Sequence, residues 1–291
     1  IISFYKVFYM LKKIAVINDI SGFGKCSLTV AIPIISALKV QACPLVTGVL
    51  SNQTCYSSYF MADMTDSMEE IINKWAELGF SFDGIYSGYL AGESQMDIVT
   101  HFVDSFKTRG AFFVLDPVMG DNGEAYSNFS DKMLHKMRVL AGKADIITPN
   151  ATELCFLSGY DYKVAVDRNG LCDVDFIEKA ALSLFDKTGA DVVVTGVCIC
   201  EKGENLVCNA ICSKGEFMLE KNKKLKGGYS GTGDIMSSVI AAMTARGFEL
   251  YEAVKTASDF ISCSVLDTLN DGTDVNDGVN FEKYLGILTN I

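Results

Sequence analysis

Short apolar runs of strand length alternate along the chain with longer amphipathic segments of helix length. Several of these runs are apolar at nearly every position, which is typical of strands that helices cover on both faces. The expected strands are residues 13–18, 42–49, 84–87, 111–115, 145–148 and 191–195. This alternation predicts an α/β fold with a mostly parallel central sheet, flanked by helices on both faces.

Several expected helices have recognisable ends. Ser67 and Glu70 form a candidate capping box, and Gly79 would end the helix that follows. Residues 93–109 and 176–187 behave likewise, with glycines at 110 and 189. Two more helices are expected at about 233–246 and 252–266. The helix that begins with the capping box at Ser67 is predicted to bury Met68, Ile71, Ile72, Trp75 and Leu78.

The pattern changes after Thr195. Short strand-like runs at 198–200, 205–212 and 216–220 are separated by Lys-Gly-Glu and Ser-Lys-Gly turns. This arrangement predicts an antiparallel meander at a sheet edge, near residues 196–221.

The number of domains is inferred from whether a linker divides the chain. Its 291 residues contain only 4 prolines and no linker-like stretch, so we expect a single domain over residues 10–291. Residues 1–9 are interpreted as an N-terminal extension, with Met10 as a plausible start. Lysines interrupt this opening stretch, which is too short to span a membrane, and no cleavage site follows it.

Charge and cysteine content narrow the class of protein. The formal net charge of −11 argues against nucleic acid or an anionic membrane as a partner, because both reward basic surfaces. Ten cysteines are dispersed, mostly in apolar runs, which favours reduced, buried thiols and a cytoplasmic location. Cysteines 198, 200, 208 and 212 could supply zinc ligands, but they lack the CxxC spacing.

Polar residues and glycines concentrate after the expected strands. In open parallel sheets, ligands bind beyond the carboxyl ends of the strands. The runs at these ends are NDISGFGK (18–25), LSNQT (50–54), SGYL (87–90), DPVMGD (116–121) and TPN with Glu153 (148–153). We therefore expect a ligand site at this edge.

The strongest single element is GGYSGTGDIMSSVIAAM, residues 227–243. Its glycines would let backbone N–H groups face an anion at the start of a helix, with Asp234 in the first turn. Taken alone, the motif fits an anion site and a simple helix cap about equally well. The sequence has no Walker P-loop and no complete dinucleotide fingerprint. Its two histidines, His101 and His135, lie in helical patterns, so carboxylates and backbone dipoles must carry any catalysis.

Five runs, in this order and spacing, resemble the pyridoxal kinase branch of the ribokinase-like superfamily. They are LSNQT, SGYL, DPVMGD, TPN-x-x-E and GTGD (231–234), and the resemblance covers nearly the whole chain from about Lys13. GTGD alone marks only the superfamily, whereas DPVMGD with SGYL and SNQT is more specific. The resemblance implies that the enzyme uses ATP as co-substrate together with Mg²⁺, and K⁺ or Na⁺ is a candidate for an additional activating ion. It also implies a B6 vitamer as substrate and a homodimer.

The resemblance also implies roles for individual residues. Asp234 matches the base that takes the proton from the substrate's 5′-hydroxymethyl group, beside an anion hole formed by Gly231, Thr232 and Gly233. Asp116 and Glu153 resemble the acids that organise Mg²⁺. The remaining matches are Thr148 near the metal, Asn150, Thr195, Asp121 and Tyr126 near the nucleotide, and Asn18, Asp19, Thr54 and Tyr89 around the pyridine ring.

One departure leaves the substrate open. The run NDISGFGKCS is closer to the corresponding segment of hydroxymethylpyrimidine kinases of thiamin biosynthesis, which belong to the same superfamily. A non-catalytic pyridoxal-binding protein is a further alternative, disfavoured because Asp116, Glu153 and Asp234 are all present. Residues 122–128 could form a flap over the nucleotide or an ordinary surface loop.

Overall fold

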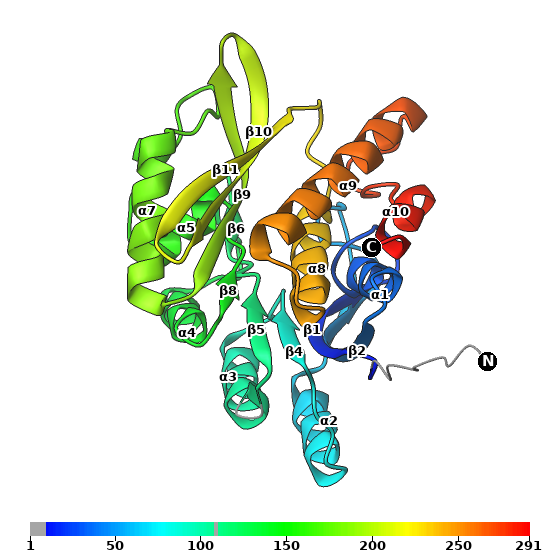
Figure 1. Cartoon of the computed structure of the whole chain (residues 1–291). Coiled ribbons are helices and arrows are strands. Elements are labelled where there is room, and N and C mark those ends of the chain that lie inside the picture. The colour runs from blue at the N-terminus through cyan, green and yellow to red at the C-terminus, as the bar shows by residue number, and fades with distance from the viewer. Residues whose placement is uncertain (1–9, 108–109) are drawn as a thin grey trace, which may run out of the picture.

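The computed structural model describes residues 10–107 and 110–291. The expected extension 1–9 and the expected helix end at Arg109 lie outside the described residues. A central sheet runs through the molecule, with strand order β11-β10-β9-β8-β5-β4-β1-β2-β3 (Figure 1). The pairs from β2 through β1, β4, β5 and β8 to β9 are all parallel, which confirms the predicted sheet.

Most expected strands are present with shifted ends. The parallel strands are β1 (Lys13–Ser21), β2 (Gln41–Leu50), β4 (Gly84–Ser87), β5 (Phe112–Leu115), β8 (Ile146–Ile147) and β9 (Asp191–Glu201). A short antiparallel strand, β3 (Met61–Asp63), adds to one edge and was not expected.

The other edge is the predicted antiparallel meander. It consists of β10 (Glu204–Ser213) and β11 (Glu216–Lys223), and β10 pairs with β11 on one side and with β9 on the other. The expected separate strand at 198–200 is wrong, because β9 continues without a break past Thr195. Its first two residues pair with β8, and residues 192–201 pair with β10, so one strand serves both parts of the sheet.

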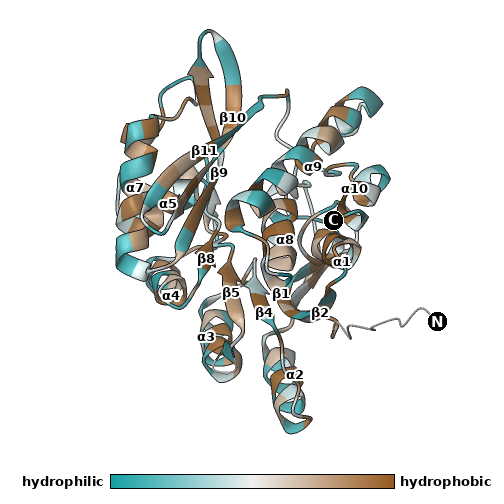
Figure 2. Cartoon of the chain, in the orientation of Figure 1, coloured by the Kyte–Doolittle hydropathy of each residue, from teal (hydrophilic) through white to brown (hydrophobic). Residues whose placement is uncertain are grey.

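Helices cover both faces of the sheet, as predicted (Figure 1). Apolar residues of the central strands lie between them, and polar residues gather on the outer helix surfaces (Figure 2). The first face carries α2 (Thr65–Glu77), α3 (Glu93–Lys107), α4 (Asp131–Ala141), α5 (Ala151–Ser158), α6 (Tyr162–Ala165) and α7 (Val174–Thr188). The second face carries α1 (Ser27–Ala37), α8 (Thr232–Ala245), α9 (Leu250–Asp271) and α10 (Leu285–Thr289), with the short 3₁₀ helix η1 (Glu282–Tyr284).

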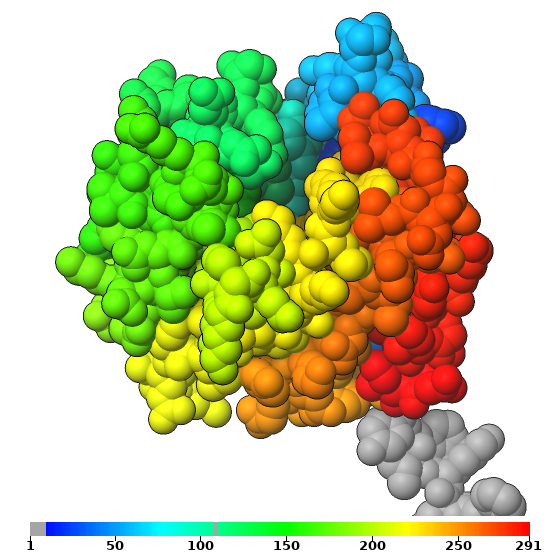
Figure 3. All heavy atoms as spheres, turned by 90° about the horizontal axis from the view of Figure 1, so that it is seen from above, coloured from blue at the N-terminus to red at the C-terminus, as the bar shows by residue number. Residues whose placement is uncertain are grey.

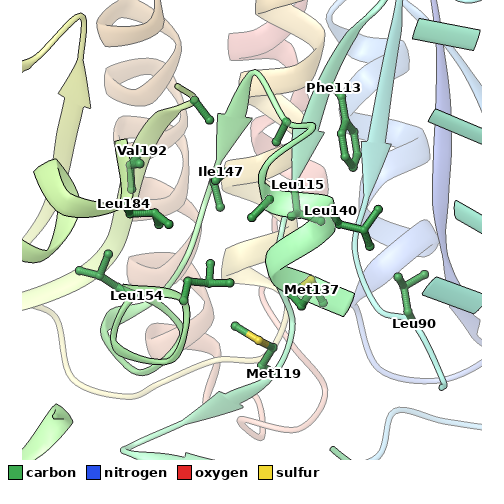
Figure 4. Close-up of a cluster of buried hydrophobic side chains, with 14 of the residues drawn as sticks. Leu90, Phe113, Leu115, Met119, Met137, Leu140, Ile147, Leu154, Leu184 and Val192 are labelled. Atoms are coloured by element: carbon green, nitrogen blue, oxygen red, sulfur yellow. The ribbon is translucent and has the colours of Figure 1, made fainter. Parts of the chain in front are cut away.

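The core is split into two layers by the sheet. Side chains that alternate along each strand point to opposite faces, so neighbouring residues of β5 enter different layers. Phe113 and Leu115 join Ile147, Leu154 and Val192 in the layer under α3 to α7 (Figure 4). Val114 enters the other layer, where it packs with residues of α1, α8 and α9. Burial on both faces explains why the strand sequences are apolar throughout.

The predicted start of α2 is wrong. The helix begins at Thr65 after Met64, and Asp63 accepts hydrogen bonds from the Thr65 backbone and side chain, so Ser67 lies inside the first turn. Leu78, expected in the core, is 63 % exposed because α2 ends at Glu77 and Leu78 follows the last turn as its C-cap. The other four apolar residues predicted for this helix pack against the core.

Loops from distant parts of the chain meet at the carboxyl edge of the sheet. Gln53, after β2, donates to the Asn276 carbonyl oxygen at 3.0 Å, and Ser230, before α8, donates to the Val275 carbonyl at 3.3 Å. The backbone N–H of Lys25 donates to the Asp277 carbonyl at 3.0 Å. In the view from above, the corresponding blue, yellow and orange segments lie side by side (Figure 3). The segment 273–280 therefore ties together three of the loops in which polar residues were expected to gather.

Among the described residues, no helix is long and apolar enough to cross a membrane.

Candidate active site

Asp234 lies in the first turn of α8, at the carboxyl edge of the sheet. Gly231 is the N-cap and adopts a left-handed conformation, with φ of +85°. A Cβ at this position would lie 2.2 Å from the Lys25 carbonyl oxygen, so the β1–α1 loop and the start of α8 pack backbone to backbone. This contact requires glycine on both conformational and steric grounds.

The two residues after Gly231 are less constrained. Thr232 donates from its hydroxyl to the Tyr229 carbonyl oxygen at 3.3 Å. A Cβ at Gly233 would meet nothing within 4 Å, so the protein itself does not require glycine there. The start of α8 therefore presents backbone N–H groups beside open space, which suits an anion.

Asn18 connects the end of β1 to Asp234. Its side-chain amide donates to the Asp234 carboxylate at 3.3 Å. Its Oδ1 accepts from the backbone N–H of Tyr89 at 2.9 Å and of Asp19 at 3.0 Å. Gly88 makes this approach possible, since a Cβ there would lie 2.4 Å from the Asn18 amide nitrogen. Asn18 thus positions Asp234, and its hydrogen bonds within the protein leave few donors or acceptors for the expected pyridine ring.

The environment of Asp234 makes it a better proton acceptor than an ordinary aspartate. Burial raises the pKa of Asp234 to about 6, and the Asp19 carboxylate adds to this rise. The Ser27 backbone N–H and the Asn18 amide oppose it. A pKa near the operating pH suits a general base, because the group is ionised at neutral pH yet still holds a transferred proton.

Asp116 directly follows β5, and a hydrogen bond from α8 fixes its carboxylate. Ser237, one turn after Asp234, donates to the Asp116 carboxylate at 3.1 Å. The Ser237 hydroxyl also lies 2.8 Å from the Thr148 hydroxyl, and either group can donate in this contact. The Thr148 hydroxyl therefore acts one step behind Asp116. Burial, together with the Asp234 carboxylate, raises the pKa of Asp116 to about 8.

Glu153 faces Asp116 from the start of α5. Asn150 is the N-cap and accepts from the Glu153 backbone N–H at 2.9 Å, while Glu153 accepts from the Asn150 N–H at 2.8 Å and from the Met119 N–H at 3.1 Å. This capping box fixes a carboxylate that is 4 % exposed. Burial and the Asp116 charge raise the pKa of Glu153 well above its ordinary value.

The carboxylates of Asp116 and Glu153 are suited to bind a divalent cation that a bound phosphate also coordinates. Asp116 and Glu153 form no ion pair with a lysine or arginine in the part of the chain that the structure describes. A cation would stabilise this pair, because both carboxylates are buried and the Asp116 charge raises the pKa of Glu153. Within residues 10–107 and 110–291 no three acidic, histidine or cysteine side chains form a closed metal cluster. Mg²⁺ suits this donor set, because it is usually bound by one or two carboxylates together with waters and substrate phosphates.

The residues expected around the pyridine ring divide into two groups. Tyr89 is half-buried and its hydroxyl accepts from the Asn128 amide at 3.2 Å, while Thr54 is exposed in the loop after β2. Asp19, in contrast, is buried and accepts from the Ser27 hydroxyl at 2.6 Å and from the Ser21 hydroxyl at 3.2 Å. Its carboxylate holds the turn into α1, so it shapes the site from behind.

Residues 120–125 form a small hairpin rather than a free loop. Its strands are β6 (Gly120–Asp121) and β7 (Glu124–Ala125), joined by Asn122 and Gly123, both with positive φ. The Gly123 N–H donates to the Thr152 hydroxyl at 2.9 Å, and a Cβ there would lie 2.5 Å from the Tyr162 ring. The hairpin is therefore fastened to α5 and α6.

The residues expected near the nucleotide lie around this hairpin. The Asn150 amide donates to the Gly120 carbonyl oxygen at 2.9 Å, and its backbone forms an isolated bridge with Thr195 on β9. Asp121 is exposed and accepts from the Asn122 backbone N–H. Tyr126 is 45 % exposed, and nearby carboxylates, Glu153 first, add to the effect of burial in raising its pKa. The structure thus brings these four residues to one side of Asp116.

The cysteines do not form a metal site. All ten are free, and no zinc cluster is present among the described residues. Cys155, Cys208 and Cys212 are buried, but Cys55, Cys200 and Cys263 are exposed and the others are intermediate. The expectation of mostly buried thiols is therefore wrong. The exposed ones lie in the loop after β2, near the end of β9 and on α9, where an apolar neighbour in sequence does not imply burial.

Two residues of the site were missed in the sequence. Ser237 follows Asp234 by one helical turn, so helical periodicity could have placed it near the same carboxylates. Gln53 is buried and its side chain joins the β2 loop to Asn276 and to the Cys55 N–H. No local pattern signals this second contact, because its partner lies 223 residues away.

Comparison with known proteins identifies the class of enzyme. The family model described as phosphomethylpyrimidine kinase matches residues 31–279. Pyridoxal kinase of Dictyostelium discoideum is 27 % identical over 221 residues, which are 72 % of this chain and 70 % of that protein. This chain is therefore a kinase that phosphorylates a hydroxyl group. The non-catalytic alternative is not supported.

Solved structures agree over almost the whole chain. A protein of Bacteroides thetaiotaomicron, provisionally named a phosphomethylpyrimidine kinase and crystallised with pyridoxal, is 38 % identical, with a TM-score of 0.87 and 96 % of each chain covered. Pyridoxal kinase of Lactobacillus plantarum is 27 % identical, with a TM-score of 0.85, covering 96 % of this chain and 97 % of that one. The chain belongs to the family of pyridoxal and phosphomethylpyrimidine kinases, with the ribokinase-like fold.

Proposed function

We propose that the protein transfers a phosphoryl group from ATP to the 5′-hydroxymethyl group of pyridoxal, pyridoxamine or pyridoxine. The observation that carries this proposal is the position of Asp234, held by Asn18 at the start of α8 beside open space. The relative crystallised with pyridoxal, 38 % identical to this chain, supports a pyridine substrate.

Asp234 is proposed as the base. Its raised pKa lets it accept the proton of the substrate hydroxyl as the oxygen attacks phosphorus. Phosphoryl transfer requires mainly positioning and stabilisation of charge. The N–H groups at Gly231, Thr232 and Gly233 are proposed to bind the transferring group, where one preorganised donor is typically worth roughly 10²- to 10³-fold in rate.

Asp116 and Glu153 are proposed to hold Mg²⁺, with Thr148 supporting Asp116 through Ser237. When bound, this ion neutralises negative charge on the phosphates. The two carboxylates would then be ionised, and the cation would replace their mutual repulsion with attraction. K⁺ or Na⁺ is proposed as an additional activating ion.

Tyr89 and Thr54 are proposed to contact the ring, and Asp19 to shape that pocket from behind. Asn150, Thr195, Asp121 and Tyr126 are proposed to border the nucleotide. The hydrogen bond between the Tyr89 hydroxyl and Asn128 would link the two regions, because Asn128 and Tyr126 lie in the same segment directly after the hairpin.

A pyrimidine substrate is the second candidate, favoured by the family model. The two substrates are separated by initial rates with ATP and Mg²⁺ on the three B6 vitamers and on hydroxymethylpyrimidine, measured side by side. We expect kcat/KM for at least one vitamer to exceed that for the pyrimidine by tenfold or more. A clear preference for the pyrimidine would overturn the B6 assignment while leaving the roles of Asp234 and the metal acids intact.

We further propose that residues 10–291 form one domain, that the enzyme acts in the cytoplasm, and that it is a homodimer. Light scattering coupled to size-exclusion chromatography would give the mass, and a single calorimetric transition is expected for one cooperative domain.

A further inference from the structure

Tyr86 lies directly beneath the proposed catalytic carboxylates. In the parallel register of the sheet it is level with Val16 of β1 and Val114 of β5. Side chains two residues apart on a strand share a face. Asn18 and Asp116 therefore stand one step nearer the carboxyl edge than Tyr86, on the face that α8 covers.

The hydroxyl of Tyr86 is buried without a hydrogen-bond partner among the described residues. The rest of the side chain is fully buried as well. The hydroxyl of Ser238, on α8, is likewise buried and unpartnered in that part of the chain. A buried hydroxyl without a hydrogen-bond partner destabilises the fold, and phenylalanine would fill the same space without that cost.

The surroundings of this hydroxyl show what it could serve. Apart from burial itself, the carboxylates of Asp234 and Asp116 are the largest influences that raise the pKa of Tyr86. In return, the Tyr86 hydroxyl is one of the groups that lower the pKa of Asp234. The phenol thus stays protonated at neutral pH and remains a donor close to two acceptors.

We propose that Tyr86 is a positioning residue of this kinase, whose hydroxyl donates to the Asp234 carboxylate when substrates are bound. Asn18 already holds one side of that carboxylate at 3.3 Å. A second donor from β4 would fix its orientation toward the acceptor hydroxyl without touching substrate. The inference rests on the proposed role of Asp234 as base.

Tyr86→Phe removes the hydroxyl and keeps the ring. We expect kcat to fall roughly 10- to 100-fold, the range for a hydrogen bond to a charged group, with KM for ATP and for the B6 substrate within threefold of wild type. The Mg²⁺ concentration for half-maximal rate should not change, because the hydroxyl acts on Asp234 and not on Asp116. The thermal midpoint should equal or exceed that of wild type.

Two further variants separate the hydroxyl from the ring. Tyr86→Leu should lower kcat as much as Tyr86→Phe but also lower the thermal midpoint, because it leaves a cavity. Tyr284→Phe, in the same apolar layer but near the C-terminus, is the matched control and should leave kcat unchanged.

The outcomes distinguish the inference from the proposed function. If the wild-type enzyme is active and the kcat of Tyr86→Phe lies within twofold of its kcat, the inference is overturned and the proposed function stands. A shifted Mg²⁺ requirement, which would place the hydroxyl on Asp116, would also overturn the inference, and so would a fall in kcat that parallels a lower thermal midpoint in Tyr86→Phe. Absence of wild-type turnover on every B6 vitamer and the pyrimidine would overturn the proposed function, and the inference with it.

Discussion

The side-chain amide of Asn18 donates to the carboxylate of Asp234 across 216 residues of sequence, joining the first strand to the helix that begins the C-terminal part of the chain. The same asparagine accepts from the Tyr89 backbone, so the carboxyl ends of β1 and β4 and the start of α8 share one residue. The geometry of Asp234 is therefore a property of the whole sheet edge and not of the GTGD run alone.

Asn18→Asp should shift the acidic limb of the pH–rate profile. The pKa of Asp234 is about 6, and only its ionised form accepts a proton, so kcat/KM should fall as pH drops through about 6. The variant replaces a donor with a negative charge, which raises the pKa of Asp234 further and moves this fall to higher pH. Asn169→Asp, in an exposed loop, is the control. Superimposable acidic limbs in Asn18→Asp and wild type would contradict the contact.

Asp234→Ala should abolish turnover while leaving ligand binding within a few-fold of wild type. The reason is that the carboxylate acts on the reacting proton, whereas its neighbours bind the substrates. Steady-state rates and titration calorimetry with a B6 vitamer test the two halves separately. Turnover close to wild type would remove Asp234 from the mechanism.

Gly231→Ala and Gly233→Ala form a matched pair. At Gly231 an added Cβ meets the Lys25 carbonyl oxygen at 2.2 Å in a left-handed conformation, so we expect a loss of stability of about 1–3 kcal/mol or more. At Gly233 a Cβ meets nothing, so stability should be preserved or slightly increased. Turnover should fall in both variants if phosphate occupies the space beside Gly233. Urea unfolding and initial rates measure the two effects, and full activity in Gly233→Ala would argue against an anion at that point.

The pKa of Asp116 predicts how stability depends on pH without metal. Its folded pKa of about 8 exceeds the ordinary value of about 3.9, so the folded protein binds more protons than the unfolded chain between these values. The contribution of Asp116 to stability therefore falls as pH rises from about 4 to about 8. In metal-free buffer, Asp116→Asn should flatten the decline of the thermal midpoint over this range. Asp121→Asn, at an exposed carboxylate, is the control, and equal slopes in Asp116→Asn and wild type would contradict the prediction.

The sequence by itself determined the sheet, the layers and the edge that carries the site. Fully apolar strands and one-sided helices allow few arrangements, and parallel strands bring their carboxyl ends together. The runs that contain Asn18, Asp116 and Glu153 were therefore placed at this edge of the sheet without coordinates. Helix starts and exposed faces were placed less well, as Ser67 and Leu78 show, because capping geometry and the outer face of a helix depend on the neighbouring chain.

Only the tertiary structure decided which polar groups are already occupied. Asn18 and Asp19 follow one another in sequence, yet one orients Asp234 and the other holds the turn into α1. In the sequence, Tyr86 is indistinguishable from the apolar residues of its strand. Only the packing of that strand against α8 leaves its hydroxyl unpartnered near two carboxylates. Hydrogen bonds between residues more than a hundred positions apart leave no local pattern, because strand and helix periodicity report only the face on which a side chain lies.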